Sequence, residues 1–153
     1  MLPPAYRARA EEGVNRLAAQ VGLRLRLHDR LINSRPALQA AEFAREHGRF
    51  EPMHRELFRA YWDQGRDVSD MAVLREVASL AGADAAGMEA AVTANRFGDY
   101  LDARRAEAEE LMIDGIPAHV IADRYLVMGA QPYDVFERVL AKVGVPKRGS
   151  DPA

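Results

Sequence analysis

The chain has 153 residues, of which 48% are hydrophobic and 29% are charged, and it contains no cysteine. This length and composition are typical of a compact soluble domain with a single core. The formal charge is −2, and Arg and Glu alternate along the chain, which argues against nucleic acid as a partner because nucleic-acid binders gather basic residues on one face. Without cysteine, the chain has no thiol, disulfide or sulfur-ligated metal of its own.

The sequence also gives no sign of a membrane partner. No apolar run approaches the roughly 20 residues of a membrane-spanning helix. The start of the chain, Met1 to Pro4, lacks the basic and then apolar order of a secretory signal peptide. We therefore expect a cytoplasmic protein, although the same pattern would be seen if a further segment preceded Met1 in the native protein.

The first two thirds of the chain carry the three- to four-residue apolar spacing of amphipathic helices. Between the first two helices, the alternation from Leu23 to Leu27 predicts a short half-buried strand or an extended link. Ser34, Ser69 and Asp84 are placed to cap helices. Glycines and prolines delimit the helices, which we predict at about 4–21, 34–47, 52–64, 69–81, 84–92 and 97–112.

The third of these helices has the bulkiest apolar stripe in the chain. The stripe is made of Met53, Leu57, Phe58, Tyr61 and Trp62. Aromatic rings at helical spacing are usually core residues, so we expect this helix to be central to the core. Stacking of Phe58, Tyr61 and Trp62 on a flat ligand is the alternative interpretation.

The periodicity changes in the last third of the chain. Two short apolar runs, 117–121 and 125–128, flank Ala122-Asp123-Arg124 and predict a β-hairpin. A final helix follows and ends at Gly144, and residues 145–153 form a polar tail. The predicted fold class is mainly α with a small β-hairpin (α+β). Because two strands alone are marginally stable, the hairpin must pack on helices or on strands from elsewhere.

Most patterns that would indicate catalysis or metal binding are missing. The four histidines lack a convincing spacing to carboxylates, and Glu51 with His54 forms one Glu-x-x-His step where a di-iron bundle needs two such steps and two further glutamates. No serine lies in a nucleophile elbow, and no Gly-rich phosphate loop is found. We predict no catalytic residue, no cofactor and no metal site.

One constellation is specific. Gly115-Ile116-Pro117 ends the sixth helix and runs into Val120-Ile121, and Met128-Gly129-Ala130-Gln131-Pro132 follows the second strand. These motifs resemble, in the same order, those of the DsbA-like thiol-disulfide oxidoreductases of the thioredoxin superfamily, most closely the FrnE-type branch. The resemblance runs from about residue 4 to residue 143, and the upstream motifs similar to the family's helical insertion are Asn33, 41–44, 57–62 and 65–70.

The resemblance implies a truncated thioredoxin-like fold with a DsbA-type helical insertion. The implied parts are a helical bundle over 1–114, the hairpin and last helix over 115–144, and the tail. It further implies that Pro117 is a cis proline facing the redox cysteines. Ile116, Pro117 and Ala118 would then bind protein or peptide thiol substrates, with the backbone of Ile116 pairing with an extended peptide.

Two departures from the family pattern matter. Family members begin with a strand and a helix opened by Cys-x-x-Cys, which this sequence lacks, and a low-pKa thiolate is what carries electrons in this chemistry. The hairpin turn is the lesser departure, because Ala122-Asp123-Arg124 stands where the family commonly has Asp-Gly. The chain alone is therefore expected to be redox-inert.

Three functions stay open. The first is part of a DsbA/FrnE-like protein disulfide oxidoreductase, shortened by truncation, gene division or cleavage. The second is a non-catalytic peptide-binding or scaffold module of the same fold. The third is a glutathione-dependent isomerase or transferase of the kappa type, although no serine motif of that type is present. The free hairpin edge predicts a missing N-terminal segment or a homo-oligomer as its partner.

Overall fold

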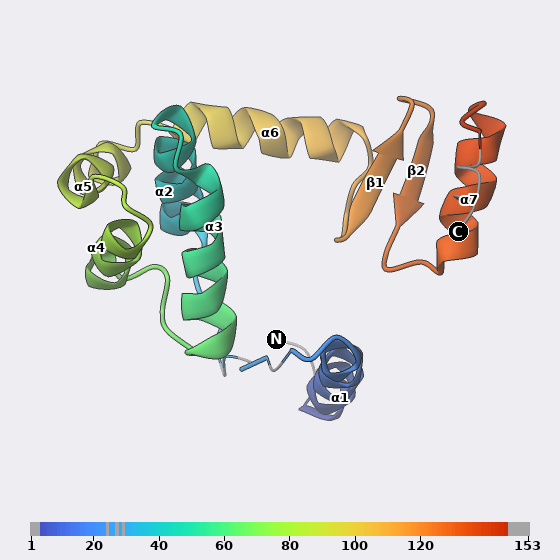
Figure 1. The fold of residues 1–153 in the computed structure, drawn as a ribbon, viewed down its shortest axis with the longest axis horizontal. Coiled ribbons are helices and arrows are strands. Elements are labelled where there is room, and N and C mark those ends of the chain that lie inside the picture. Colours follow the sequence, from blue (N-terminus) through green and yellow to red (C-terminus); the bar gives the residue numbers. More distant parts are fainter. Residues whose placement is uncertain (1–3, 24, 27, 29, 147–153) are drawn as a thin grey trace, which may run out of the picture. The chain divides into compact units, whose positions relative to one another are not determined.

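The computed structural model describes residues 4–23, 25–26, 28 and 30–146, with side chains from residue 12 onward. Seven α-helices, one π-helical turn and one hairpin make up this part of the chain, which confirms the predicted fold class (Figure 1). In chain order the elements are α1 (Pro4–Gln20), α2 (Arg35–Glu46), α3 (Phe50–Phe58), η1 (Arg59–Asp63), α4 (Met71–Leu80), α5 (Ala85–Thr93), α6 (Gly98–Glu110), β1 (Ala118–Ile121), β2 (Tyr125–Met128) and α7 (Tyr133–Lys142).

The chain divides into two compact units, Met1–Leu101 and Asp102–Ala153, which are called here the helical unit and the hairpin unit. The boundary falls inside α6. None of the helices in the described part of the chain combines the length and the apolar composition that a membrane crossing requires.

The helical unit has a core of its own, built by α2, α3, α4 and α5. α2 contacts α3, α4 and α5, and α4 packs on both α3 and α5. The largest fully buried side chains are Met53, Leu74, Val77 and Met88, and the burial of each such side chain stabilises the fold by about 1.5 to 3 kcal/mol. The remaining core positions on α2 are mostly alanines, which let the helices approach closely.

Helix capping agrees with the sequence at one position and differs at two. Asp84 accepts a hydrogen bond from the Ala86 N–H and caps α5, as predicted. Ser34 occupies the N-cap position of α2 but makes no capping hydrogen bond with its side chain. The prediction that Ser69 caps α4 was wrong, because Asp70 is the cap and the Ser69 hydroxyl donates to the carboxylate of Asp67.

The segment between α1 and α2 forms an extended link in its described part. Leu23, Leu25 and Arg26 belong to no helix or strand, and residues 24 and 27 of the predicted alternation lie outside the described residues. The backbone N–H of Arg26 donates to the carbonyl of Trp62 at 2.7 Å, which attaches the link to the end of η1.

In the hairpin unit, β1 and β2 pair antiparallel with Ala118 opposite Met128 and Ile121 opposite Tyr125. Ala122 and Asp123 both have φ near 52°, and the Arg124 N–H donates to the carbonyl of Ile121 at 3.2 Å. Two successive residues with positive φ define a type I′ turn, which matches the twist of the strands. The hairpin therefore forms without the glycine that such turns usually contain.

One face of the hairpin packs toward α7, and the other face is exposed. On one face the His119 ring lies edge-on to Phe136 of α7, with ring centres 5.0 Å apart, and Val127, the partner of His119 in the ladder, is buried. On the other face the paired Val120 and Leu126 are both exposed. A strand pair that is apolar on both faces is typical of a sheet covered on both sides.

Candidate functional site

The candidate site begins where α6 gives way to β1. The N–H groups of Leu111, Met112 and Ile113 bond to carbonyls of the last turn of α6, and Met112 takes a positive φ of 56° that stops the helix. The inward position predicted for Leu111 was wrong, because its side chain is 45% exposed. The chain then runs through Gly115 into the Ile116–Pro117 peptide bond, which is cis.

The loop after β2 holds this segment in place. The N–H of Gly129 donates to the carbonyl of Pro117 at 2.8 Å, and the side-chain amide of Gln131 donates to the carbonyl of Met128 at 2.8 Å. Gly129 has a φ of 78°, a conformation that glycine adopts at little cost. From the sequence, this loop was predicted to begin the last helix and was one of the motifs that resemble the DsbA-like family. Its second role, fixing Pro117, became visible in the tertiary structure.

Ile116 is strongly exposed in this segment. Its side chain is 93% exposed, and within the described residues its backbone N–H and C=O form no hydrogen bond. Ala118, two residues on, is already paired in β1. An unpaired backbone beside a strand is a template on which an extended peptide can add as a further strand. The three residues proposed from the sequence therefore lie together, with Ile116 presented outward.

The described residues hold no group of three or more His, Asp or Glu side chains that could bind a metal ion. Two of the histidines have structural partners: the His47 ring donates to the carbonyl of Phe43 at 2.7 Å, and the His28 ring donates to the carbonyl of Tyr61 at 3.2 Å. His119 packs against Phe136. What the candidate site offers is backbone pairing and apolar contact.

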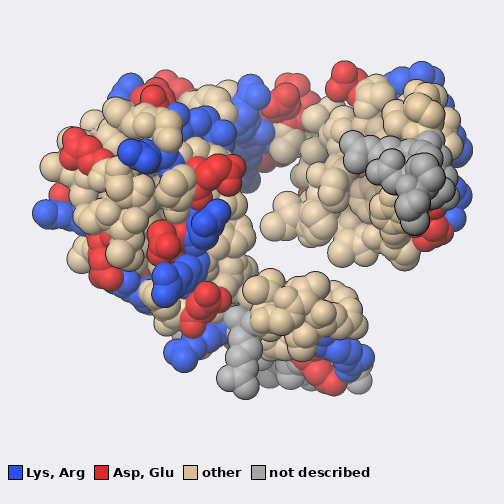
Figure 2. All heavy atoms as spheres, in the orientation of Figure 1, with Lys and Arg blue, Asp and Glu red and all other residues tan. Residues whose placement is uncertain are grey.

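Charged groups with shifted pKa values are found at surface pairs. Hydrogen bonds from Ser69 lower the pKa of the Asp67 carboxyl, and Arg66 lowers the pKa of Glu76 in the same way. Both pairs belong to the helical unit, where basic and acidic side chains are interspersed on the face seen in Figure 2. These shifts accompany structural ion pairs and mark no acid-base site.

The aromatic stripe of α3 and η1 is only partly in the core. Met53 and Leu57 are buried as predicted, but Phe58 is 53% exposed, and Tyr61 and Trp62 are half-buried. Tyr61 still packs against the hydrophobic core, so the prediction that all five residues of the stripe are core residues was wrong for Phe58 and Trp62.

Comparison with protein families gives one match that spans most of the chain. The model of the DSBA-like thioredoxin domain matches residues 7–141. The matched residues begin within the first turn of α1, include the candidate site and end one residue before the end of α7.

Two individual proteins extend this finding. The chain is 28% identical to a probable DsbA oxidoreductase of Streptomyces coelicolor whose crystal structure is known, with a TM-score of 0.79 over 99% of this chain and 66% of the other. It is 26% identical over 106 residues to the uncharacterized protein YwbO of Bacillus subtilis, a match that covers 69% of this chain. The chain spans about half the length of YwbO, since the match covers 52% of that protein.

Proposed function

Because this chain belongs to the family of DSBA-like thioredoxin domains, we propose that it is part of a protein disulfide oxidoreductase of the FrnE type. In this proposal the chain binds the substrate, and a segment outside this sequence supplies the redox thiols. The proposal rests on the exposure of Ile116 beside Pro117. The Ile116 side chain is exposed and its backbone forms no hydrogen bond within the described residues, while the chain contains no cysteine.

The proposed role of Ile116, Pro117 and Ala118 is to align a substrate polypeptide. The N–H and C=O of Ile116 pair with an extended peptide, and the hydrogen bond from Gly129 to Pro117 keeps that backbone in position. The substrate is a protein or peptide thiol. Electron transfer requires a low-pKa thiolate, so this chain alone carries out no redox step.

Peptide binding is tested with the reduced, unfolded B chain of insulin as the probe, followed by amide NMR shifts. We expect shifts confined to the residues around Ile116 and Ala118. Ile116→Pro, which removes the backbone N–H, should abolish the shifts, while the matched variant Ile116→Ala should retain them. Equal loss in both variants would contradict backbone pairing, and no shift in the unmodified chain would contradict the peptide site.

The origin of the thiols is tested separately. The nucleotide sequence upstream of the Met1 codon should encode, in frame or in a neighbouring gene, a strand followed by a helix opened by Cys-x-x-Cys. Its absence, together with intact peptide binding, would favour the second function, a non-catalytic peptide-binding module. Turnover in an insulin-reduction assay by this cysteine-free chain would contradict both functions.

The free edge of β1 also requires a partner. Among the described residues β1 pairs only with β2, and the exposed Val120 and Leu126 leave one face of the hairpin apolar. We propose that either an N-terminal segment of the thioredoxin-like half or a second copy covers them. Light scattering of this chain at micromolar concentration should show a dimer or larger assembly, and a monomer would contradict self-association.

A further inference from the structure

Six helices in the described part of the chain end in the same way, with one left-handed residue that reverses the backbone. In each, the N–H of this residue donates to the carbonyl three residues back, and the next N–H donates to the carbonyl five residues back. This is the Schellman motif, whose left-handed position usually holds glycine because glycine has no Cβ to clash there. The left-handed residues after α1, α2, α4, α5, α6 and α7 are Gly22, Gly48, Gly82, Asn95, Met112 and Gly144.

Met112, at the end of α6, differs from the other five. Four of those are glycine, and the fifth is asparagine, which adopts the left-handed conformation more readily than most residues. Met112 has a φ of 56°, which is unfavourable for a long apolar side chain. The end of α6 is therefore less stable than glycine would make it.

The Met112 side chain contributes little to the fold of this chain. It is 81% exposed, whereas Met53 and Met88 are fully buried. The apolar contact that often accompanies a Schellman motif joins other positions, here Ala108 and Ile113, and both of these side chains are half-buried. Strained residues cluster at functional sites, where the strain is retained because the residue has a further role. A role in binding would explain why a methionine stands here.

Met112 lies four residues before Ile116, on the connection from α6 to β1. Four residues of chain span at most about 14 Å, so an extended peptide of about five residues that pairs with Ile116 is long enough to reach Met112. Both residues belong to the hairpin unit, and their side chains are among its most exposed apolar ones. Met112 is thus within reach of the proposed peptide site.

Backbone pairing at Ile116 distinguishes poorly between peptides, because every residue except proline presents the same N–H and C=O groups. When a peptide adds to a sheet as a strand, specificity comes from contacts to its side chains. Methionine suits such contacts, since its side chain is apolar, unbranched and polarizable and adapts to partners of different shape.

We propose that Met112 is a specificity-determining residue of the peptide site. It selects unfolded polypeptide segments that carry a large apolar side chain close to the residue paired with Ile116. This inference rests on the proposed function and names the class of substrate segment that the site prefers. The strain at Met112 is retained because its side chain contacts the bound polypeptide.

Two matched peptides measure this selection. Both are capped seven-residue peptides of threonine and lysine, one with a central leucine and the other with a central serine. Amide NMR titration of the unmodified chain should show tighter binding of the leucine peptide, with shifts at Met112 and Ile116. Met112→Gly should weaken binding of the leucine peptide by roughly fivefold, because one apolar contact is lost, and should leave binding of the serine peptide unchanged.

Stability measured on the same variant separates a binding role from a structural one. Met112→Gly should raise the urea midpoint, because glycine removes the strain at the end of α6. Met112→Asn controls for the flexibility of glycine, since asparagine also tolerates the left-handed conformation, and it should bind like Met112→Gly. Met112→Leu keeps a large apolar side chain and should retain the preference for the leucine peptide.

The outcomes distinguish this inference from the peptide site on which it rests. Equal binding of the two peptides by the unmodified chain, or an undiminished leucine preference in Met112→Gly, would overturn the role of Met112 and leave the peptide site intact. A lower urea midpoint in Met112→Gly would also overturn it, because the side chain would then pack within this chain. Failure of the insulin B chain and of both peptides to bind would contradict the peptide site and this inference together.

Discussion

The helical unit and the hairpin unit differ in how completely their apolar side chains are buried. In the helical unit, four helices surround Met53, Leu74, Val77 and Met88, and all four side chains are fully buried. Among the described residues of the hairpin unit, only Val127 is buried. The first unit closes a core with its own residues, whereas the second leaves apolar side chains exposed.

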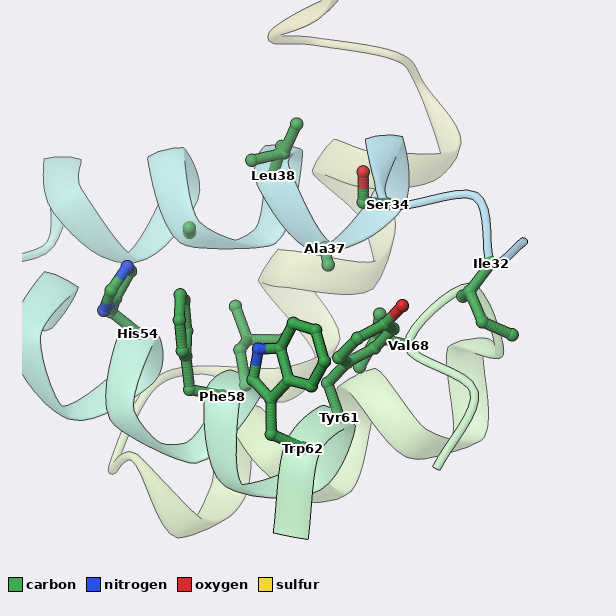
Figure 3. Close-up of a pocket in the computed structure, with 11 residues that line it drawn as sticks. Ile32, Ser34, Ala37, Leu38, His54, Phe58, Tyr61, Trp62 and Val68 are labelled. Atoms are coloured by element: carbon green, nitrogen blue, oxygen red, sulfur yellow. The ribbon is translucent and has the colours of Figure 1, made fainter. Parts of the chain in front are cut away.

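This contrast bears on function. A unit with a closed core can hold a surface in a fixed shape, such as the groove of about 250 Å³ between α2 and α3–η1 (Figure 3). A unit with an open strand edge and one uncovered apolar face is suited to receive another polypeptide, because both the backbone and the side chains there lack partners. The two units therefore differ in how ready they are to receive another polypeptide.

The largest expected effect is on the core of the helical unit. Leu74 is 0% exposed, and Leu74→Ala should lower the free energy of unfolding by about 2 to 5 kcal/mol, because it removes buried methyl groups and leaves a cavity. Leu80→Ala is the matched control on the same helix, since Leu80 is 63% exposed. Urea denaturation followed by circular dichroism measures both, and equal effects would show that this core is not closed.

A smaller effect is expected in the hairpin unit. Val127→Ala should destabilise the hairpin by about 1 to 2 kcal/mol, because it uncovers the face that packs toward α7. The amide exchange rates of β1 and β2 should rise while those of α2–α5 stay unchanged. Val120→Ala, on the other face of the hairpin, should have almost no effect at protein concentrations low enough to keep the chain monomeric. A cost as large as that of Val127→Ala would mean that a partner covers this face.

The type I′ turn offers a way to strengthen the weaker unit. Ala122 has a φ of 52°, and a left-handed conformation costs a non-glycine residue about 1 kcal/mol. Ala122→Gly should therefore stabilise the hairpin, as measured by slower amide exchange in β1 and β2. Ala118→Gly is the control, because it places glycine inside a strand and should destabilise it. Stabilisation by both variants would contradict the turn assignment.

The smallest effect concerns pH and the helical unit. Hydrogen bonds from Ser69 lower the pKa of Asp67 in the folded state, so the carboxylate stabilises the fold at neutral pH. That contribution is complete above the unfolded pKa of about 4 and is lost as the pH falls through the lower folded value. Asp67→Asn should flatten the acid side of the stability curve measured by urea denaturation. An unchanged slope in that variant would show that Asp67 has no such role.

The elements of this protein follow closely from its sequence, because apolar spacing, glycine stops and the change of period near Pro117 are local signals. The capping residue of α4 did not follow, since Ser69 and Asp70 are adjacent and both suit an N-cap. The type I′ turn did not follow from the sequence either, because alanine is unusual at a position that requires a positive φ and no glycine is present.

By itself the sequence determined the fold class, the hairpin and the family to which Gly115-Ile116-Pro117 points. Only the tertiary structure decided which residues are accessible. The outward position of Ile116, the bond between Gly129 and Pro117, the π-helical turn and the exposed side of Phe58 all depend on what lies across from each residue. Helical and strand periodicity specify on which side of its element a residue lies. Whether that residue is buried depends on residues that are distant in sequence.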